Sequence, residues 1–223
     1  QGLLLLGNYS WYLDNMVKIH RLKGDINSEI AKSFKGSVAI DTEATGLKIP
    51  ERDKLSLIQI CAENGDVYVI QPDKKTYKAP NLVSVLENDK ILKIGHFLRF
   101  DKSALEFFLK CKLKNIFCTK IASRLVRTYD SFHGLKDLTR EFCNKNLDKR
   151  QGSSDWNKDI NDLSDKQLEY AANDVIYLHK IKTELEKMLK RENRMDLYKN
   201  CITFLDTRIK LDQSGFKFDV FEH

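Results

Sequence analysis

Apolar positions along this chain follow two spacings, and each spacing predicts one kind of element. Segments in which apolar residues alternate with polar ones, or run continuously, predict strands at 37–44, 54–63, 66–72 and 91–97. Asn64-Gly65, between the second and third of these strands, is a strong signal for a tight hairpin. We therefore expect the first three strands to form an antiparallel meander.

Apolar residues spaced three and four apart predict helices between and after the strands. The helices are expected at 79–88, 101–113, 165–190 and 192–212, with a short strand feeding a helix over 115–126. Ser164 and Gln167 form a capping-box pattern at the start of the longest helix. Strands followed by strands mixed with helices are typical of an α/β sheet covered by helices.

The composition predicts one soluble globular domain. At 223 residues, with 42% hydrophobic and 31% charged residues, the chain has material for one substantial core. The 3 prolines and the lack of a Gly/Ser-rich stretch leave no sign of a linker. Its 5 cysteines are scattered without CxxC spacing, which predicts neither a zinc site nor a disulfide framework and favours a reducing cytosol. The longest apolar runs are too short to cross a membrane, so no membrane partner is expected.

The positive charge of the chain is concentrated in one segment. The net charge is +6, and the segment between Lys110 and Arg150 alone carries a net charge of +7, so the rest of the chain is about neutral. A concentrated basic surface is expected of a polyanion-binding protein. A lysine-rich solvated surface explains the same count equally well.

Asp41 and Glu43 end the strand predicted at 37–44. Residues two apart on a strand face the same side, so the two carboxylates can converge where the strand leaves the core. Gly46 then allows a close turn, and Leu47 places an apolar side chain beside the acidic pair. An acidic strand end followed by a turn is the simpler alternative for this pair alone.

Three further residues complete a candidate metal site. Tyr170 and Asp174 are four apart in a predicted helix and therefore share a face. Asp101 opens another predicted helix, where the alternative is an N-cap. Hard divalent cations such as Mg²⁺ take oxygen ligands, and two ions about 4 Å apart can assist phosphodiester cleavage. Tyr170, with an ordinary pKa of about 10, is suited to orient a water molecule and not to act as a base.

At this point the chain resembles the ribonuclease D-type members of the DEDD 3′–5′ exonucleases. Asp41 and Glu43 in IDTEATGL match the first motif of that family, and Asp101 in FLRFDKSAL matches the second. Tyr170 and Asp174 in YAANDVIYL match the third, with the Y-x-x-x-D spacing of the tyrosine (DEDDy) branch. The segment 133–156 is also similar to ribonuclease D sequences.

The resemblance implies a ribonuclease H-like fold, with a mixed sheet of antiparallel first strands and parallel later strands flanked by helices. It implies a single exonuclease domain over 1–223, with a core at about 36–190 and a helical extension at 191–223. The extension is too short for the helical HRDC domains of many bacterial ribonucleases D. The resemblance is with the compact, standalone forms, which implies the bacterial cytoplasm.

The implied activity is stepwise removal of 3′ nucleotides as 5′-monophosphates with two divalent ions, Mg²⁺ or Mn²⁺. Asp41, Glu43 and Asp174 are then expected to bind one ion, and Asp41 with Asp101 the other, while Tyr170 positions the nucleophilic water. The further residues that we expect to contact the substrate are Leu47, Gln59, His96, Arg99, Arg124, Arg127, Ser154 and Trp156. Packing roles for His96 and Trp156 are equally compatible with the sequence.

Three functions remain open at this level. The first is an exoribonuclease of tRNA and other small RNAs, which takes RNA with a free 3′ end in preference to DNA. The second is a DNA 3′–5′ exonuclease of repair or proofreading, because the acids act on the phosphodiester and not on the sugar. The third is a catalytically silent nucleic-acid-binding module, which the intact set of acids disfavours. No obligate protein partner is indicated.

Overall fold

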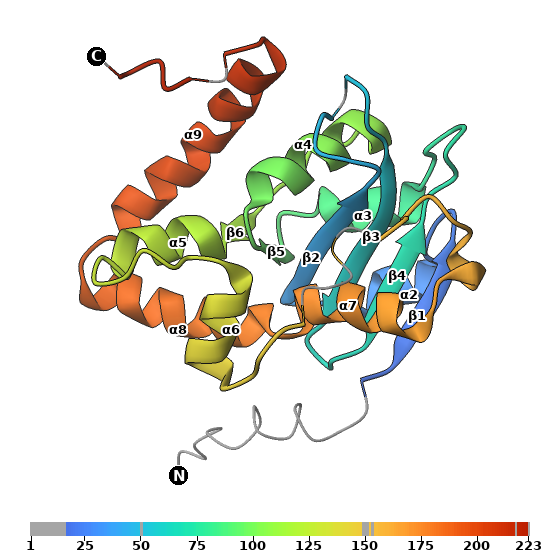
Figure 1. Ribbon diagram of the computed structural model, residues 1–223, viewed down its shortest axis with the longest axis horizontal. Helices are drawn as coiled ribbons and strands as arrows, with labels where there is room; N and C mark the ends of the chain where they lie inside the picture. The colour runs from blue at the N-terminus through green and yellow to red at the C-terminus, as the bar shows by residue number, and fades with distance from the viewer. Residues whose placement is uncertain (1–16, 50, 149–151, 153, 217, 223) are drawn as a thin grey trace.

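A computed structural model describes residues 17–49, 51–148, 152, 154–216 and 218–222 (Figure 1). A six-stranded mixed sheet forms its centre, in the order β1-β4-β3-β2-β5-β6. The strands are β1 (Ile19–Lys23), β2 (Ser37–Ala44), β3 (Leu55–Ala62), β4 (Val67–Gln71), β5 (Leu92–Gly95) and β6 (Ile116–Cys118). The predicted ribonuclease H-like α/β fold is confirmed.

The predicted meander is present, and the sheet extends beyond it on both sides. β2 pairs antiparallel with β3, and β3 pairs antiparallel with β4. β5 and β6 continue the sheet in parallel beside β2. The strand β1, parallel to β4, has no counterpart among the predicted strands, because its sequence IHRLK is polar and sits at a half-exposed edge. The folded core therefore includes β1, upstream of the start predicted at about residue 36.

Helices cover both faces of the sheet and form two apolar layers. The helices are α2 (Ser28–Ser33), α3 (Pro80–Leu86), α4 (Leu98–Leu109), α5 (Thr119–Val126), α6 (Leu135–Cys143), α7 (Asp165–Ile176), α8 (Leu178–Arg191) and α9 (Met195–Gln213), with a short 3₁₀ helix η1 (Ile160–Asp162). α5 to α8 lie on one face, and α2 to α4 lie on the other (Figure 1). No helix of the described segments is long and apolar enough to cross a membrane.

Two predicted helix boundaries are wrong. The helix expected at 165–190 is divided at Tyr177 into α7 and α8, although no Gly or Pro marks the break. α7 packs across β2, β3 and β4, whereas α8 packs on α5 and α6, so the division follows from two different packing partners. α4 begins at Leu98 with Phe97 as its N-cap residue, so Asp101 lies in its first turn and does not cap it.

The topology brings three strand ends to one edge of the sheet. β5 is parallel to both β2 and β6, so their carboxyl ends point the same way. In open sheets with parallel strands, ligands bind at this edge. β2 ends there with its two acidic residues, and β5 leads directly into α4, which carries Asp101.

The last helix is fastened to this framework through buried polar contacts. The hydroxyl of Tyr198, a residue only 4% exposed, accepts a 2.8 Å hydrogen bond from the backbone N–H of Cys118 at the end of β6. The buried ammonium of Lys102 on α4 lies 3.1 Å from the carboxylate of Asp206 on α9. Leu205 and Ile209 of α9 belong to the apolar layer beneath α4. Helix α9 is thus integrated with the sheet.

We predict that Tyr198→Phe lowers the free energy of unfolding by about 1–3 kcal/mol, because the buried N–H of Cys118 loses its acceptor. Urea unfolding of the purified protein measures the change. Tyr129→Phe is the matched control, since Tyr129 is 67% exposed and its hydroxyl bonds Glu141 at the surface. Equal losses in the two variants would contradict a structural role for the Tyr198 hydroxyl.

Candidate active site

β2 presents its two acidic side chains on the face covered by α7. Ala39, two residues before Asp41, belongs to the apolar layer beneath α7 and α8, and the alternation of the strand places Asp41 and Glu43 on that same face. The register of β2 against β3 shifts between Glu43 and Ala44. The acidic pair therefore lies where the regular pairing of the sheet ends.

Helix α7 brings the third acid to this point. Ser164 and Gln167 form the predicted capping box, which fixes where α7 begins. Asp174 is 6% exposed on α7, which packs across β2, β3 and β4. Carboxylate oxygens of Asp41, Glu43 and Asp174 all lie within 4.8 Å of one another. The structure thus assembles three of the four predicted metal-binding acids into one cluster.

The donor set of this cluster suits a hard divalent cation. Its potential ligands are carboxylate oxygens, which Mg²⁺ and Mn²⁺ prefer to nitrogen or sulfur. Three carboxylates at this spacing repel one another, and a bound cation removes that repulsion. The residues present therefore fit the metal that the sequence predicts.

Asp101 approaches from the opposite face of the sheet. It is 3% exposed, and one of its oxygens accepts a 2.6 Å hydrogen bond from the hydroxyl of Thr42, the β2 residue between Asp41 and Glu43. Burial raises the pKa of Asp101 to about 7, the Thr42 hydrogen bond opposes this rise, and the negative charge of Asp174 adds to it. Asp101 stands outside the cluster of three but within the electrostatic reach of Asp174.

Tyr170 lies on α7 one turn before Asp174. Burial raises the pKa of its hydroxyl above the ordinary value, and the charges of Asp174, Glu43 and Asp41 raise it further, together with a hydrogen bond to Asp174. The hydroxyl is therefore neutral at physiological pH. It can donate and accept hydrogen bonds beside the acids, but it cannot serve as a general base.

Trp156 supports Tyr170 and does not reach the substrate. It is 3% exposed, and its ring lies against that of Tyr170 with centroids 5.9 Å apart and an interplanar angle of 33°. The prediction that Trp156 contacts a base is therefore wrong, because no face of the indole is open. Its position indicates that it fixes the orientation of the tyrosine ring.

Gln59 is likewise misassigned as a substrate contact. It is paired in register with Asp41 on the neighbouring strand β3. Its side chain has 0% exposure, so it cannot touch a bound strand. Neither amide atom finds a hydrogen-bond partner among the described residues.

Arg127 is a structural cation and not part of a phosphate path. It is 1% exposed and forms salt bridges with Glu141 and with Asp130, the latter at 3.0 Å. It also donates to the carbonyl oxygen of Phe132. These contacts hold the loop after α5 against α6. All three nitrogens of the guanidinium donate hydrogen bonds within the protein, so none is available to a ligand.

The remaining predicted contacts lie in accessible positions. Leu47 is 85% exposed at the tip of the loop after β2. Arg99 in the first turn of α4 is bound to Asp212 of α9, and Arg124 on α5 is exposed. Ser154 is half-buried beyond α6. Nδ1 of His96, directly after β5, lies 2.9 Å from the hydroxyl of Thr119.

Two supporting residues escaped the sequence prediction. Thr42 carries no signal except its place between Asp41 and Glu43, with its side chain on the other face of β2. Asp53 is 5% exposed and accepts a 2.8 Å hydrogen bond from the backbone N–H of Lys48, closing the loop that carries Leu47. A Cβ at Gly46 would come within 2.5 Å of the Asp53 carboxylate, so glycine is required there.

We predict that the metal-free protein loses stability as the pH rises from about 4 to 7. The folded-state pKa of Asp101, about 7, lies above its unfolded value of 3.8, so between these values the folded state keeps a proton that the unfolded chain has released. The free energy of unfolding therefore falls with rising pH, by about 3 kcal/mol between pH 5 and pH 7. Urea unfolding in EDTA at pH 5 and pH 8 measures the fall.

Asp101→Asn is the control. Because an amide has no proton to release in this pH range, the contribution of residue 101 to the loss of stability disappears. Adding Mg²⁺ at pH 8 should restore stability to the parent by mass action. The same fall in the parent and the variant would show that Asp101 is ionised throughout.

We further predict that Arg127→Met destabilises the fold by about 2–4 kcal/mol, because Glu141 and Asp130 lose their buried partner. Thermal unfolding measures the loss, with Arg140→Met as the control, since Arg140 is exposed on the same helix as Glu141. A loss of stability no larger than that of Arg140→Met would contradict a structural role for Arg127.

Comparison with known proteins agrees with this geometry. Residues 16–190 match the family model described as 3′–5′ exonuclease. Ribonuclease D of Haemophilus influenzae is 34% identical over 70% of this chain and 38% of the relative, and DNA polymerase I of Aquifex aeolicus is 33% identical over 67% of this chain and 24% of the relative. The chain thus spans well under half the length of these curated relatives.

Solved structures extend the likeness over the whole fold. NrnC of Brucella melitensis is 42% identical over 92% of this chain and 98% of that chain, with a TM-score of 0.85. A structure of that nuclease with bound Mg²⁺ is 41% identical to this chain, with a TM-score of 0.84. A structure bound to pGG is 42% identical, with a TM-score of 0.86. Each match covers 93% of this chain and 100% of the matched chain. The sheet, the acidic cluster and these matches together place the chain in the 3′–5′ exonuclease family, in its ribonuclease D-like branch.

Proposed function

We propose that this protein is a 3′–5′ exoribonuclease that removes 3′-terminal nucleotides as 5′-monophosphates with the help of two divalent ions, Mg²⁺ or Mn²⁺. The observation that carries the proposal is the cluster of Asp41, Glu43 and Asp174, whose oxygens lie within 4.8 Å of one another, with Asp101 and Tyr170 beside it. A dense carboxylate cluster destabilises a fold unless cations bind to it.

The side chains divide the task between them. Asp41, Glu43 and Asp174 would hold one ion, and Asp41 with Asp101 the other. Bound ions would stabilise the charge that develops on the attacking and leaving oxygens. The neutral hydroxyl of Tyr170 would orient the water that attacks the phosphorus. The Mg²⁺-bound structure of NrnC supports the metal requirement.

Single-stranded RNA with a free 3′ end is the proposed substrate, in small RNAs and the 3′ ends of tRNA precursors. We expect Leu47, which is 85% exposed in the loop after β2, to pack against the terminal base. The NrnC structure bound to pGG supports short strands as part of the same substrate class. The proposed site of action is the cytoplasm.

DNA is the second candidate polymer, and the match to DNA polymerase I of Aquifex aeolicus favours it. The two polymers differ at the 2′-hydroxyl, so discrimination depends on contacts to that group and not on the acids. Matched RNA and DNA strands therefore separate the two candidates directly.

The test is digestion of a 5′-labelled RNA, its DNA counterpart and pGG in Mg²⁺ or Mn²⁺. We expect a ladder shortened from the 3′ end, release of 5′-monophosphates, faster loss of RNA than of DNA, and no reaction in EDTA. Asp174→Asn should reduce the rate by more than about 100-fold, the upper end of what loss of a residue supporting a metal ligand costs.

Asp162→Asn provides the matched control, because Asp162 is an exposed carboxylate of η1 outside the cluster. Degradation that persists in EDTA, or an Asp174→Asn variant as active as Asp162→Asn, would overturn the proposal. Faster loss of DNA than of RNA would assign the same site to the second candidate.

A further inference from the structure

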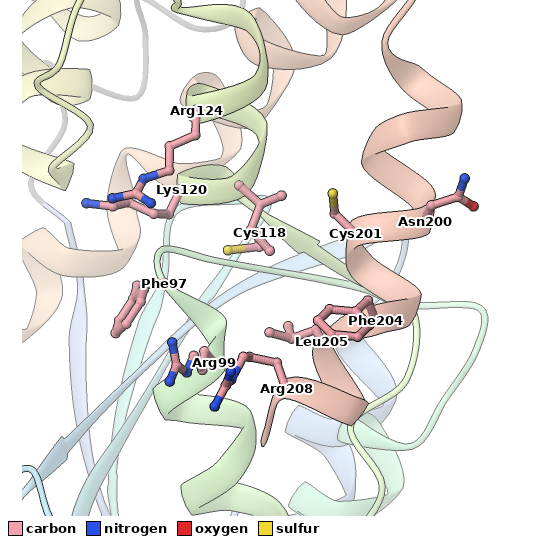
Figure 2. Close-up of a pocket in the computed structure, with 11 residues that line it drawn as sticks. Phe97, Arg99, Cys118, Lys120, Arg124, Asn200, Cys201, Phe204, Leu205 and Arg208 are labelled. Atoms are coloured by element: carbon pink, nitrogen blue, oxygen red, sulfur yellow. The ribbon is translucent and has the colours of Figure 1, made fainter. Parts of the chain in front are cut away.

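A cleft of about 640 Å³ opens between α4, α5 and α9, apart from the acidic cluster (Figure 2). Phe97 and Arg99 line it from the start of α4, Lys120 and Arg124 from α5, and Phe204 and Arg208 from α9. Four cationic side chains thus surround one hollow that also contains two aromatic rings. This combination suits a ligand with both phosphates and flat bases.

The cations of the cleft differ in how firmly they are held. Arg99 and Arg208 both bind the carboxylate of Asp212, which fixes them and neutralises part of their charge. Lys120 and Arg124 form no salt bridge with any described residue. Burial lowers the pKa of Lys120, and the neighbouring charge of Arg124 lowers it further, while Asp137 opposes the change. The positive potential is therefore strongest on the α5 side of the cleft.

Both aromatic side chains are partly exposed, although the ring of Phe204 also lies 5.9 Å from that of Phe221. Phe97 is 49% exposed, and its backbone adopts φ 63° and ψ 42°, the left-handed region that a bulky residue rarely occupies. Strain of this kind is found preferentially at functional sites. Phe204 is 40% exposed on the opposite wall. Figure 2 shows Phe97, Lys120 and Arg124 on one side of the cleft and Phe204 on the other.

The cleft lies on the same edge of the sheet as the acids. Phe97 follows the carboxyl end of β5, Cys118 is the last residue of β6, and the acidic pair ends β2. β5 lies next to β2, and β6 next to β5, so the ends of β2 and β6 are about 10 Å apart at the usual strand spacing. The first turn of α4 joins the two sites, since Arg99 belongs to the cleft and Asp101 to the active site.

We propose that this cleft binds the single-stranded nucleic acid upstream of the scissile bond, with Lys120 and Arg124 contacting backbone phosphates and Phe97 and Phe204 stacking on bases. The proposal rests on the proposed function, because the cleft lies along the end of the sheet where a strand with its 3′ end at the acids can continue. It assigns part of the basic segment 110–150 a definite role.

The test measures binding without cleavage. Fluorescence anisotropy of a labelled RNA heptamer is recorded at several salt concentrations with the Asp174→Asn protein, and again after adding Lys120→Gln and Arg124→Gln. Each lost phosphate contact flattens the slope of log K against log salt by about 0.7 for a single strand, so we expect a change of about 1.4. Lys32→Gln with Lys35→Gln on and beside α2 removes the same charge far from the cleft and should leave the slope unchanged.

A second pair of variants tests stacking. Phe204→Ala should weaken binding by about fivefold or more, as expected for loss of one stacked base. Phe107→Ala is the matched control, because Phe107 is 39% exposed on α4 outside the cleft. Thermal unfolding confirms that each variant is folded.

The outcomes separate the two proposals. A slope equal to that of the Lys32/Lys35 control would overturn the proposal that the cleft binds nucleic acid, even if the parent protein degrades RNA. A flattened slope, together with a parent protein that releases no mononucleotides, would support nucleic-acid binding in the cleft and overturn the proposed function. Sedimentation is run on the same samples, and a change in oligomeric state with an unchanged slope would identify the cleft as an interface between copies of this chain.

Discussion

Mutual repulsion among three carboxylates is the constraint on which the rest of the structure depends. At about 4 Å, two like charges repel by about 1 kcal/mol in bulk water and about 4 kcal/mol near a protein surface. Nothing in the local chain favours bringing Asp41, Glu43 and Asp174 within 4.8 Å. The arrangement is imposed by β2, which is fixed between β3 and β5, and by α7, which packs across the sheet through buried apolar residues.

The alternation of β2 explains how one strand gathers acids from two helices on opposite faces. Asp41 and Glu43 face α7, whereas Thr42 between them faces α4 and donates its hydroxyl proton to a hydrogen bond with Asp101. The side chains of three consecutive residues therefore point to both faces of the sheet. Two buried residues support the site from behind. Trp156 packs against the ring of Tyr170, and Asp53 accepts a hydrogen bond from the Lys48 N–H in the loop that carries Leu47.

Prediction from sequence succeeded where the signal is local and periodic. The meander was predictable because alternating apolar residues and Asn-Gly specify strands and a hairpin, and the capping box of α7 is encoded within four residues. The division of the long helix at Tyr177 was not predictable, because it arises from a change of packing partner and not from a residue that disfavours helix. Gln59 and Arg127 were misassigned because polarity in a sequence does not reveal burial.

The sequence by itself determined the chemistry, since acids spaced two apart on a strand, with Tyr and Asp four apart on a helix, can present oxygen ligands on shared faces. Only the tertiary structure decided which acids meet and what each polar residue contacts. Asp41 and Asp174 are brought together across more than half of the chain by parallel strand order and by the packing of α7. Such distances close through cooperative burial of apolar surface, whose outcome no short segment encodes.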